Sequence, residues 1–116
     1  MAVLHIVPNV AADDVATLRQ FYVDLFRLEV KAELDWFAAL VTSTDSPTRI
    51  NIAQHGGSGA PVADISFEVD DVEATYERAQ QLGSKILYEL KDEPWGVRRF
   101  NVIDPAGKRL NIYAQI

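Results

Sequence analysis

Asparagine occurs at matching places in two nearly repeated segments of this 116-residue chain, and its amide offers chemistry for binding. Residues 49–54 read RINIAQ and residues 109–114 read RLNIYA, which aligns Asn51 with Asn111. An amide both donates and accepts hydrogen bonds, so these two residues suit the recognition of a polar ligand. The alternative is that the two amides bond to each other or to the backbone, and the sequence leaves both interpretations open.

Other polar side chains alternate with apolar ones in the same segments and in their neighbours. Such alternation predicts strands with one face on the core and one face open. A face that meets only water does not require asparagine, which is depleted in strands. The polar alternates that we expect on the open face are Arg49, Asn51, Asp64, Ser66, Glu68, Arg99, Asn101, Arg109, Asn111 and Tyr113. We predict ligand contacts from Asn51, Asp64, Arg99, Asn101, Asn111 and Tyr113 within this set.

Two tryptophans and one histidine complete the candidate ligand contacts. Trp36 and Trp95 lie near the starts of predicted strands, where an indole can stack on a flat ring or pack at a rim or against a second copy. Trp95 stands between Pro94 and Gly96, on a bend at the mouth of the expected site, and is the better candidate. His5, in the first predicted strand, is either a ligand contact or a packed, hydrogen-bonded residue.

A repeated order of elements must position these side chains. Strand patterns cover residues 3–9, 28–33, 36–42 and 49–54, and again 62–69, 85–90, 97–103 and 108–114. A helix is predicted after an N-cap at Asp13 or Asp14 and ends near Arg27. A second helix is predicted after an N-cap at Asp70, with Glu73 as its capping-box partner. The apolar stripes of the two helices are Val15, Leu18, Phe21, Tyr22, Leu25 and Phe26 in the first, and Val72, Tyr76, Ala79 and Leu82 in the second.

The chain therefore reads as two tandem βαβββ modules in one α+β domain. The modules are residues 1–55 and 61–116, joined by a Gly-rich linker at 55–61. Strands of this kind form a curved mixed sheet with helices outside, and we expect a trough lined by the polar alternates. Open sheet edges are usually paired or covered, so a homodimer is predicted.

Composition excludes several classes of function. A net charge of -6 with no cluster of Lys and Arg disfavours nucleic acid. The absence of an 18-residue apolar run disfavours a membrane span, and the absence of a secretory signal together with the lack of cysteine fits a cytoplasmic protein. Without cysteine there are no disulfides and no thiolate metal sites.

Four segments carry a resemblance to a known family: FYVDL at 21–25, VDDV at 69–72, PWGVR at 94–98 and DPAG at 104–107. In this order and spacing the chain resembles the glyoxalase/bleomycin resistance/extradiol dioxygenase superfamily, also called vicinal oxygen chelate. The resemblance implies the fold described above. It does not imply one activity, because that superfamily includes lyases, epimerases, dioxygenases, thiol transferases and antibiotic-binding proteins. Arg27 stands where the family usually has glycine, so we expect this helix to end differently.

The resemblance also implies where a metal would bind. The ligand positions of the metal-using relatives fall on His5, Asn51, Asp64 and Asn111. Neutral amide oxygens are poor ligands for zinc, nickel or iron, which leaves His5 and Asp64 as the strong donors. No metal cofactor is therefore favoured, and a divalent metal, if present, is expected on His5 and Asp64.

Three functions follow as hypotheses. The first is metal-free binding of a flat or cationic organic compound, as in the bleomycin-resistance branch. The alternative is a divalent-metal-dependent lyase, isomerase or dioxygenase for a small oxygenated substrate, with Asn111 or a water completing the metal shell. A third is metal-free acid/base catalysis by Asp64 or Glu68.

Overall fold

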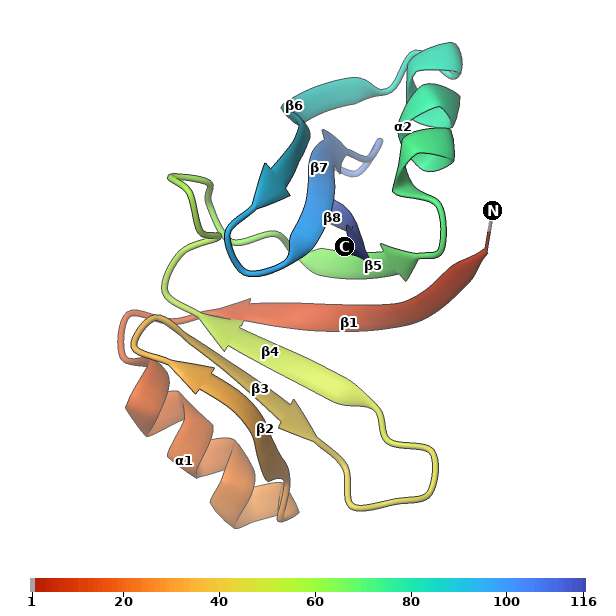
Figure 1. Ribbon diagram of the computed structural model, residues 1–116. Coiled ribbons are helices and arrows are strands. Elements are labelled where there is room, and N and C mark those ends of the chain that lie inside the picture. The colour runs from red at the N-terminus through yellow and green to blue at the C-terminus, as the bar shows by residue number, and fades with distance from the viewer. Residues whose placement is uncertain (1) are drawn as a thin grey trace. The chain divides into compact units, whose positions relative to one another are not determined.

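The computed structural model describes residues 2–116 and divides them into two compact units (Figure 1). The N-terminal unit is Val7–Val62. The C-terminal unit is Ala63–Ile116 together with residues 2–6. The boundary after Val62 adjoins the predicted linker at 55–61, where glycines and turns replace regular structure.

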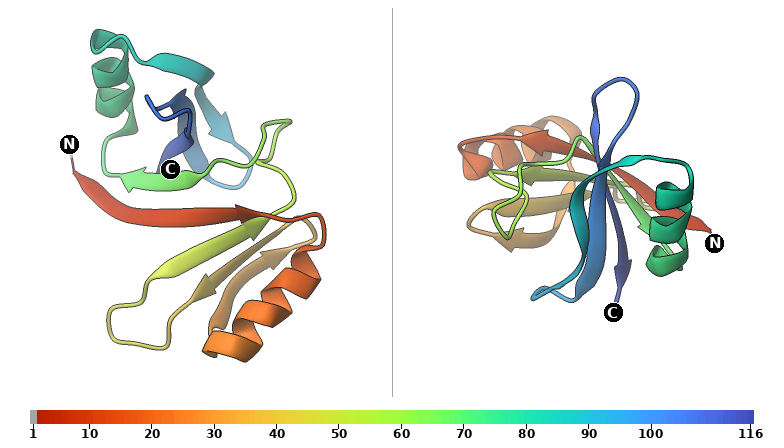
Figure 2. Two further views of the ribbon diagram at one scale, coloured as in Figure 1. Left: turned by 180° about the vertical axis from the view of Figure 1, so that it is seen from behind. Right: turned by 90° about the horizontal axis from the view of Figure 1, so that it is seen from above.

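The N-terminal unit is a four-stranded mixed sheet with one helix. Its elements are β1 (Val3–Ala11, whose first residues belong to the C-terminal unit), α1 (Val15–Phe26), β2 (Glu29–Leu34), β3 (Phe37–Val41) and β4 (Arg49–Ala53). The strand order is β2-β3-β4-β1, with β1 parallel to β4 and the other pairs antiparallel. Figures 1 and 2 show α1 lying along these strands, and the buried core of Val15, Ala38, Leu40 and Ile52 forms where they meet.

The C-terminal unit repeats this plan. Its elements are β5 (Ile65–Val69), α2 (Val72–Gln81), β6 (Lys85–Glu93), β7 (Val97–Ile103) and β8 (Arg109–Gln115). The strand order is β5-β8-β7-β6, with β5 parallel to β8 and the other pairs antiparallel. Its core joins α2 to the strands through Val69, Val72, Ala79, Phe100, Val102, Ile112 and Ala114. The predicted α+β class with two βαβββ modules is confirmed.

The helix starts differ from the predictions by one residue in α2. The N-cap of α1 is Asp14, whose carboxylate accepts the backbone N–H of Thr17 at 3.1 Å. The N-cap of α2 is Asp71, which accepts the N–H of Ala74 at 3.0 Å, so the expected cap at Asp70 was wrong. Asp70 instead accepts the backbone N–H of Ala2 at 2.7 Å. Among residues 2–116, neither helix is long and apolar enough to cross a membrane.

Arg27 ends α1 in the left-handed conformation that the family's glycine would adopt. Its φ is 55° and its N–H bonds to the carbonyl of Val23 at 2.8 Å. The expectation that this helix ends differently was therefore wrong. The closing hydrogen bond outweighs the backbone strain of a side chain in this region, which costs about 1 kcal/mol.

Replacing Arg27 with glycine is expected to raise the free energy of unfolding by about 0.5–1 kcal/mol, because glycine adopts this φ without strain. Chemical denaturation checks this. Arg78→Gly inside α2 is the control and should lower stability by about 1 kcal/mol, because no left-handed position is relieved there. A variant at position 27 no more stable than the parent would show that the strain is absent.

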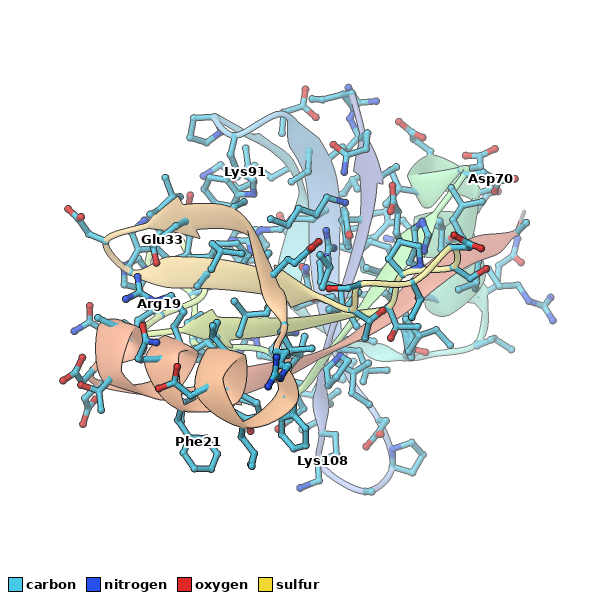
Figure 3. All side chains as sticks on the ribbon, turned by 90° about the horizontal axis from the view of Figure 1, so that it is seen from below. Arg19, Phe21, Glu33, Asp70, Lys91 and Lys108 are labelled. Carbon is cyan, nitrogen blue, oxygen red and sulfur yellow. The ribbon has the colours of Figure 1, made fainter. Side chains whose placement is uncertain are left out.

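The predicted apolar stripe of α1 is buried only in part. Leu18 and Tyr22 pack against the core, whereas Phe21, Leu25 and Phe26 are exposed. Figure 3 shows Phe21 on the side of α1 away from the strands, while Arg19 reaches Glu33 of β2 on the other side. The reason is geometric, since Phe21 lies at the edge of the stripe and the other two lie in the last turn. Leu82, after α2, is exposed in the same way.

Candidate functional site

One face of the C-terminal unit gathers most of the predicted site residues. Along β7 and β8 the apolar residues Phe100, Val102, Ile112 and Ala114 pack into the core beneath α2. Because side chains alternate along a strand, the residues between them lie on the opposite face. We call this the polar face, and it consists of Asp64, Ser66, Glu68, Arg99, Asn101, Arg109, Asn111 and Tyr113.

A directed chain of hydrogen bonds crosses the polar face. Asn101, Asn111 and Ser66 lie side by side on three adjacent strands. Arg109 Nε donates to Asn101 Oδ1 at 2.8 Å, Asn101 Nδ2 donates to Asn111 Oδ1 at 3.0 Å, and Asn111 Nδ2 donates to Ser66 Oγ at 3.2 Å. Asn101 is only 1% exposed. We call these four residues the amide chain, and their bonding fixes the orientation of each group.

A buried ion pair lies beside the amide chain. The guanidinium of Arg99 contacts Glu93 Oε2 through Nε at 2.7 Å and through Nη2 at 2.6 Å. Tyr88 donates its hydroxyl to the same oxygen at 3.0 Å. Arg99 also lies over the rings of Tyr88 and Trp95, at 4.8 and 5.0 Å from the ring centroids. Both charged side chains are almost fully buried, so removing either one would strongly destabilise the folded protein.

Charged groups also lie at both ends of the polar face. Asp64 accepts the backbone N–H of Arg109 at 2.8 Å through its carboxylate. Glu68 lies 3.9 Å from His5, measured between Oε1 and Nε2, and His5 is largely exposed. Burial, followed by the positive charge of Arg99, lowers the pKa of Arg109. The two guanidinium groups are therefore close enough to repel each other.

The N-terminal unit holds a shorter version of the amide chain. Asn51 Nδ2 donates to Asn9 Oδ1 at 2.9 Å, on adjacent strands β4 and β1. On the other side of Asn51, Ala39 stands opposite, at the place that corresponds to Asn101. Among the described residues, Asn51 Oδ1 is buried without a hydrogen-bond partner. The substitution of alanine for asparagine in the repeat explains this, because the donor that Asn101 supplies to Asn111 is missing.

The structure thus brings together seven of the nine predicted ligand contacts in the C-terminal unit. They are His5, Asp64, Trp95, Arg99, Asn101, Asn111 and Tyr113. Asn51 and Trp36 belong to the N-terminal unit, where Trp36 stacks on His55 with ring centroids 4.4 Å apart. The repeated asparagines therefore have partners in their own units. Sequence reasoning missed Glu93 and Tyr88; the one available signal was an acidic residue directly before the Pro94-Trp95-Gly96 bend.

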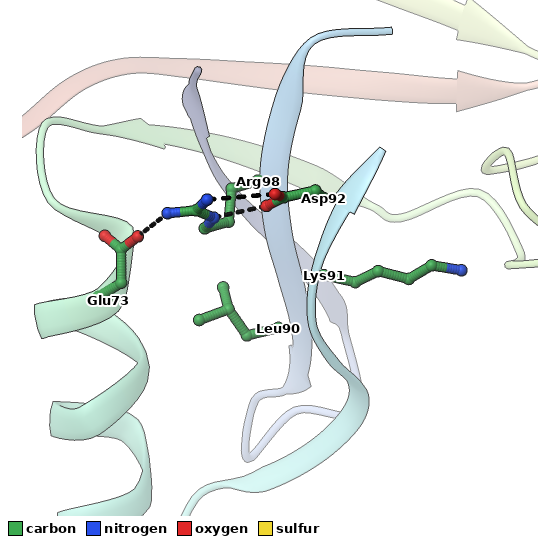
Figure 4. Close-up of a pocket in the computed structure, with 5 residues that line it drawn as sticks. All are labelled: Glu73, Leu90, Lys91, Asp92 and Arg98. Carbon is green, nitrogen blue, oxygen red and sulfur yellow. Dashed lines mark hydrogen bonds and ion pairs between the residues drawn. The ribbon is translucent and has the colours of Figure 1, made fainter. Parts of the chain in front are cut away.

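A hollow on the other side of β6 and β7 is lined by side chains that hold α2 against the β6–β7 hairpin. It measures about 530 Å³ and is lined by Glu73, Leu90, Lys91, Asp92 and Arg98 (Figure 4). Arg98 contacts both oxygens of Asp92, at 2.5 and 3.1 Å, and also pairs with Glu73. Hydrogen bonds from Arg98 hold the pKa values of both carboxylates below their usual range. These contacts tie the first turn of α2 to the β6–β7 hairpin.

Replacing Arg98 with glutamine is expected to make stability less dependent on pH in acid. The ordinary pKa values of Glu73 and Asp92, 4.5 and 3.8, are lowered in the folded protein. Their stabilising contribution is therefore complete above the ordinary values and is lost as the pH falls through the lowered ones. The parent should exceed the variant in stability near pH 7, and the difference should shrink towards about pH 2. Urea denaturation across this range checks it, with Arg78→Gln as the charge-matched control; a constant difference would contradict it.

The donor set does not fit the catalytic metal of the metal-using relatives. Asn111 Oδ1 accepts from Asn101, and one carboxylate oxygen of Asp64 accepts from the Arg109 backbone. Among residues 2–116, no group of three or more His, Asp or Glu residues is arranged to hold a metal ion. A catalytic divalent metal usually takes three protein ligands with imidazole or carboxylate donors.

Comparison with known proteins agrees with this geometry of two repeated modules. The sequence model of the Glyoxalase/Bleomycin resistance protein/Dioxygenase superfamily matches residues 2–112. The chain belongs to this superfamily. No protein of curated function matches the sequence.

Solved structures similar to this glyoxalase-superfamily chain support the fold. A chain described as NAD-dependent benzaldehyde dehydrogenase from Legionella pneumophila has a TM-score of 0.80 at 18% identity, covering 96% of this chain and 99% of the other. A superfamily member from Vibrio splendidus 12B01 has a TM-score of 0.72 at 23% identity, covering 98% and 100%. Methylmalonyl-CoA epimerase from Mycobacterium tuberculosis has a TM-score of 0.62 at 15% identity, covering 98% and 87%. Identities this low establish a shared fold and no shared activity.

Proposed function

We propose that this glyoxalase-superfamily protein binds a small organic molecule on the polar face of its C-terminal unit, without a metal ion. The observation that carries the proposal is the amide chain. Asn101 is shielded from solvent, yet its amide is hydrogen-bonded on both sides. Its Nδ2 donates to Asn111, and its Oδ1 accepts from the guanidinium of Arg109. Ligand sites typically combine apolar surroundings with a few fixed polar groups of this kind.

A flat ring on the bound compound is supported by the aromatic residues beside the amide chain. Trp95 is 41% exposed while its indole lies against Arg99, and Tyr88 lies against the same guanidinium. Aromatic side chains bury large areas of flat ligands at small entropic cost. The net charge of -6 favours a cationic compound at long range, but Arg109 favours the opposite charge at the face itself.

A thermal-shift screen tests the proposal. The library contains small aromatic and aliphatic carboxylates, amides and amines, each added before and after treatment of the protein with EDTA. We expect at least one compound to raise the melting temperature by several degrees, since a ligand at 100 times its Kd stabilises by about 2.7 kcal/mol. The shift should survive EDTA and be lost in Asn111→Ala, whereas Arg98→Gln is the control on the other side of the strands.

Two results would overturn this function. In the first, no compound shifts the melting temperature. In the second, binding requires added zinc, nickel, manganese or iron(II), and elemental analysis finds one equivalent of metal that is lost in His5→Ala. The second result would instead favour the metal-dependent lyase, isomerase or dioxygenase.

We also propose a homodimer, supported by the exposed apolar side chains on α1. Phe21 and Leu25 are 55% and 59% exposed and stand one turn apart. Arg78 of α2 is equivalent to Phe21 of α1. The repeated fold therefore does not require an apolar residue at this position. Light scattering after size exclusion should give a dimer for the parent and for Ala16→Glu, and a monomer for Phe21→Glu. A monomeric parent contradicts the dimer.

A further inference from the structure

We infer that the molecule bound on the polar face carries a carboxylate group that pairs with the guanidinium of Arg109. This inference rests on the proposed function and adds the chemical class of the ligand. The polar face belongs to a protein of net charge -6, so a site for an anion is not expected from composition. The charges and hydrogen bonds around Arg109 nevertheless favour an anion.

Three arginines of the C-terminal unit differ in how their charge is compensated. Arg98 pairs with two carboxylates, those of Glu73 and Asp92. Arg99 pairs with one, that of Glu93. Arg109 makes no ion pair with any of residues 2–116, although it is partly buried. A partly buried cation without an anion is costly unless something neutralises it, and a bound anion would do so.

The geometry of Arg109 leaves one edge of its guanidinium for a ligand. Its Nε is engaged by Asn101 Oδ1 at 2.8 Å, which fixes the plane of the group. The two terminal nitrogens form the other edge, and this fork matches the two oxygens of a carboxylate. Because Asn101 is itself held by Asn111 at 3.0 Å, the fork is oriented before any ligand arrives. Such preorganisation lowers the entropic cost of binding.

The surroundings of Arg109 strengthen the case for an anion. Burial and the charge of Arg99 together lower the pKa of Arg109, and a negative group beside Arg109 would offset both effects. Two carboxylates of the protein also belong to this face. Asp64 accepts the backbone N–H of Arg109, and Glu68 faces His5 at 3.9 Å. The alternative to a bound carboxylate is therefore an amine that binds to these two side chains.

Three matched compounds test the inference: 2-naphthoate, 2-naphthamide and 2-naphthylmethylamine, which share a ring and differ in charge. Calorimetry with the full chain should give a Kd for naphthoate at least about tenfold below that for naphthamide. In Arg109→Gln this ratio should fall to about one, and Arg109→Lys should retain part of it, because lysine keeps the charge but not the fork. Arg98→Gln should retain the full ratio, and circular dichroism confirms that each variant is folded.

The outcomes separate the two proposals. If naphthylmethylamine binds most tightly, or if the preference for naphthoate persists in Arg109→Gln, the inference is overturned and the proposed function stands. The inference also fails alone if amides or amines of the screening library bind while no carboxylate does. If no compound of either set binds, the proposed function fails and the inference fails with it.

Discussion

Replacing Arg99 with methionine is expected to lower the free energy of unfolding by about 3–5 kcal/mol, the largest loss from any single substitution considered for this chain. Arg99 and Glu93 are 5% and 4% exposed, so the variant leaves a carboxylate buried without its cation. Tyr88 donates one hydrogen bond to that carboxylate, which does not replace two charge-assisted contacts. Urea denaturation at neutral pH measures the loss.

The neighbouring arginine is the matched control for this experiment. Arg98→Met removes the same charge one residue away, but from an ion-pair cluster at the surface, where such pairs contribute little. The double variant Glu93→Leu with Arg99→Met should regain most of the lost stability, because two apolar side chains replace a buried pair without leaving a charge. A loss in Arg99→Met no greater than in Arg98→Met would contradict the burial of this pair.

Replacing Asn101 with alanine is expected to lower the free energy of unfolding by about 1–3 kcal/mol, because it leaves Asn111 Oδ1 without its donor. It should also weaken binding of any ligand on the polar face, since Arg109 loses the contact that fixes its plane. Denaturation and calorimetry with the naphthalene compounds measure the two effects.

A double-mutant cycle separates the amide chain from general packing. If Asn101 and Asn111 act through their shared hydrogen bond, the double alanine variant should lose less stability than the two single losses added together. The N-terminal unit offers a natural comparison, because Ala39 occupies the position equivalent to Asn101 and the oxygen of Asn51 has no hydrogen-bond partner among residues 2–116. Fully additive losses would show that the two amides do not depend on each other.

Alternation along strands predicted the polar face well. In β7 and β8 the strict two-residue period placed Arg99, Asn101, Asn111 and Tyr113 on one face, and the register then aligned the two asparagines. The sequence could not identify their bonding partners, because cross-strand register depends on the turn and on neighbouring strands. It therefore left open a bond between Asn51 and Asn111, whereas each amide bonds within its own unit.

Sequence reasoning missed Tyr88 and Glu93 of β6 for different reasons. The pairing of β6 with β7 shifts register between Ile86 and Tyr88 and again between Tyr88 and Lys91. The first shift reverses which residues face the core, so counting alternate positions from Ile86 assigns Tyr88 to the wrong face. The second shift restores the order, and Glu93 was missed because the predicted strand ended at residue 90. Glu93 could also be read as one more surface acid beside Asp92. Its burial depends on Arg99, which sequence spacing alone does not pair with it.

The residues at the helix ends also did not predict the C-cap of α1 and the N-cap of α2 correctly. Asp70 and Asp71 are adjacent and both can cap a helix, so the capping box with Glu73 favoured the wrong one. In the structure Glu73 pairs with Arg98, a partner 25 residues away. Arg27 shows the converse, because a hydrogen bond to Val23 keeps the left-handed cap without glycine. A tertiary contact engages Glu73, whereas the end of α1 depends on a local hydrogen bond of its last turn.

Nuclear magnetic resonance of the labelled protein shows whether a small molecule binds on the polar face, when the protein is titrated in turn with 2-naphthoate, 2-naphthamide, 2-naphthylmethylamine and any library compound that raises the melting temperature. A small-molecule site on the polar face predicts that the side-chain amide signals of Asn101 and Asn111 shift with at least one compound, while the signals of Arg98 and Leu90 stay in place. Shifts confined to the hollow around Arg98, or no shift on the polar face with any of the three compounds or of the library compounds that raise the melting temperature, would contradict a small-molecule site on the polar face.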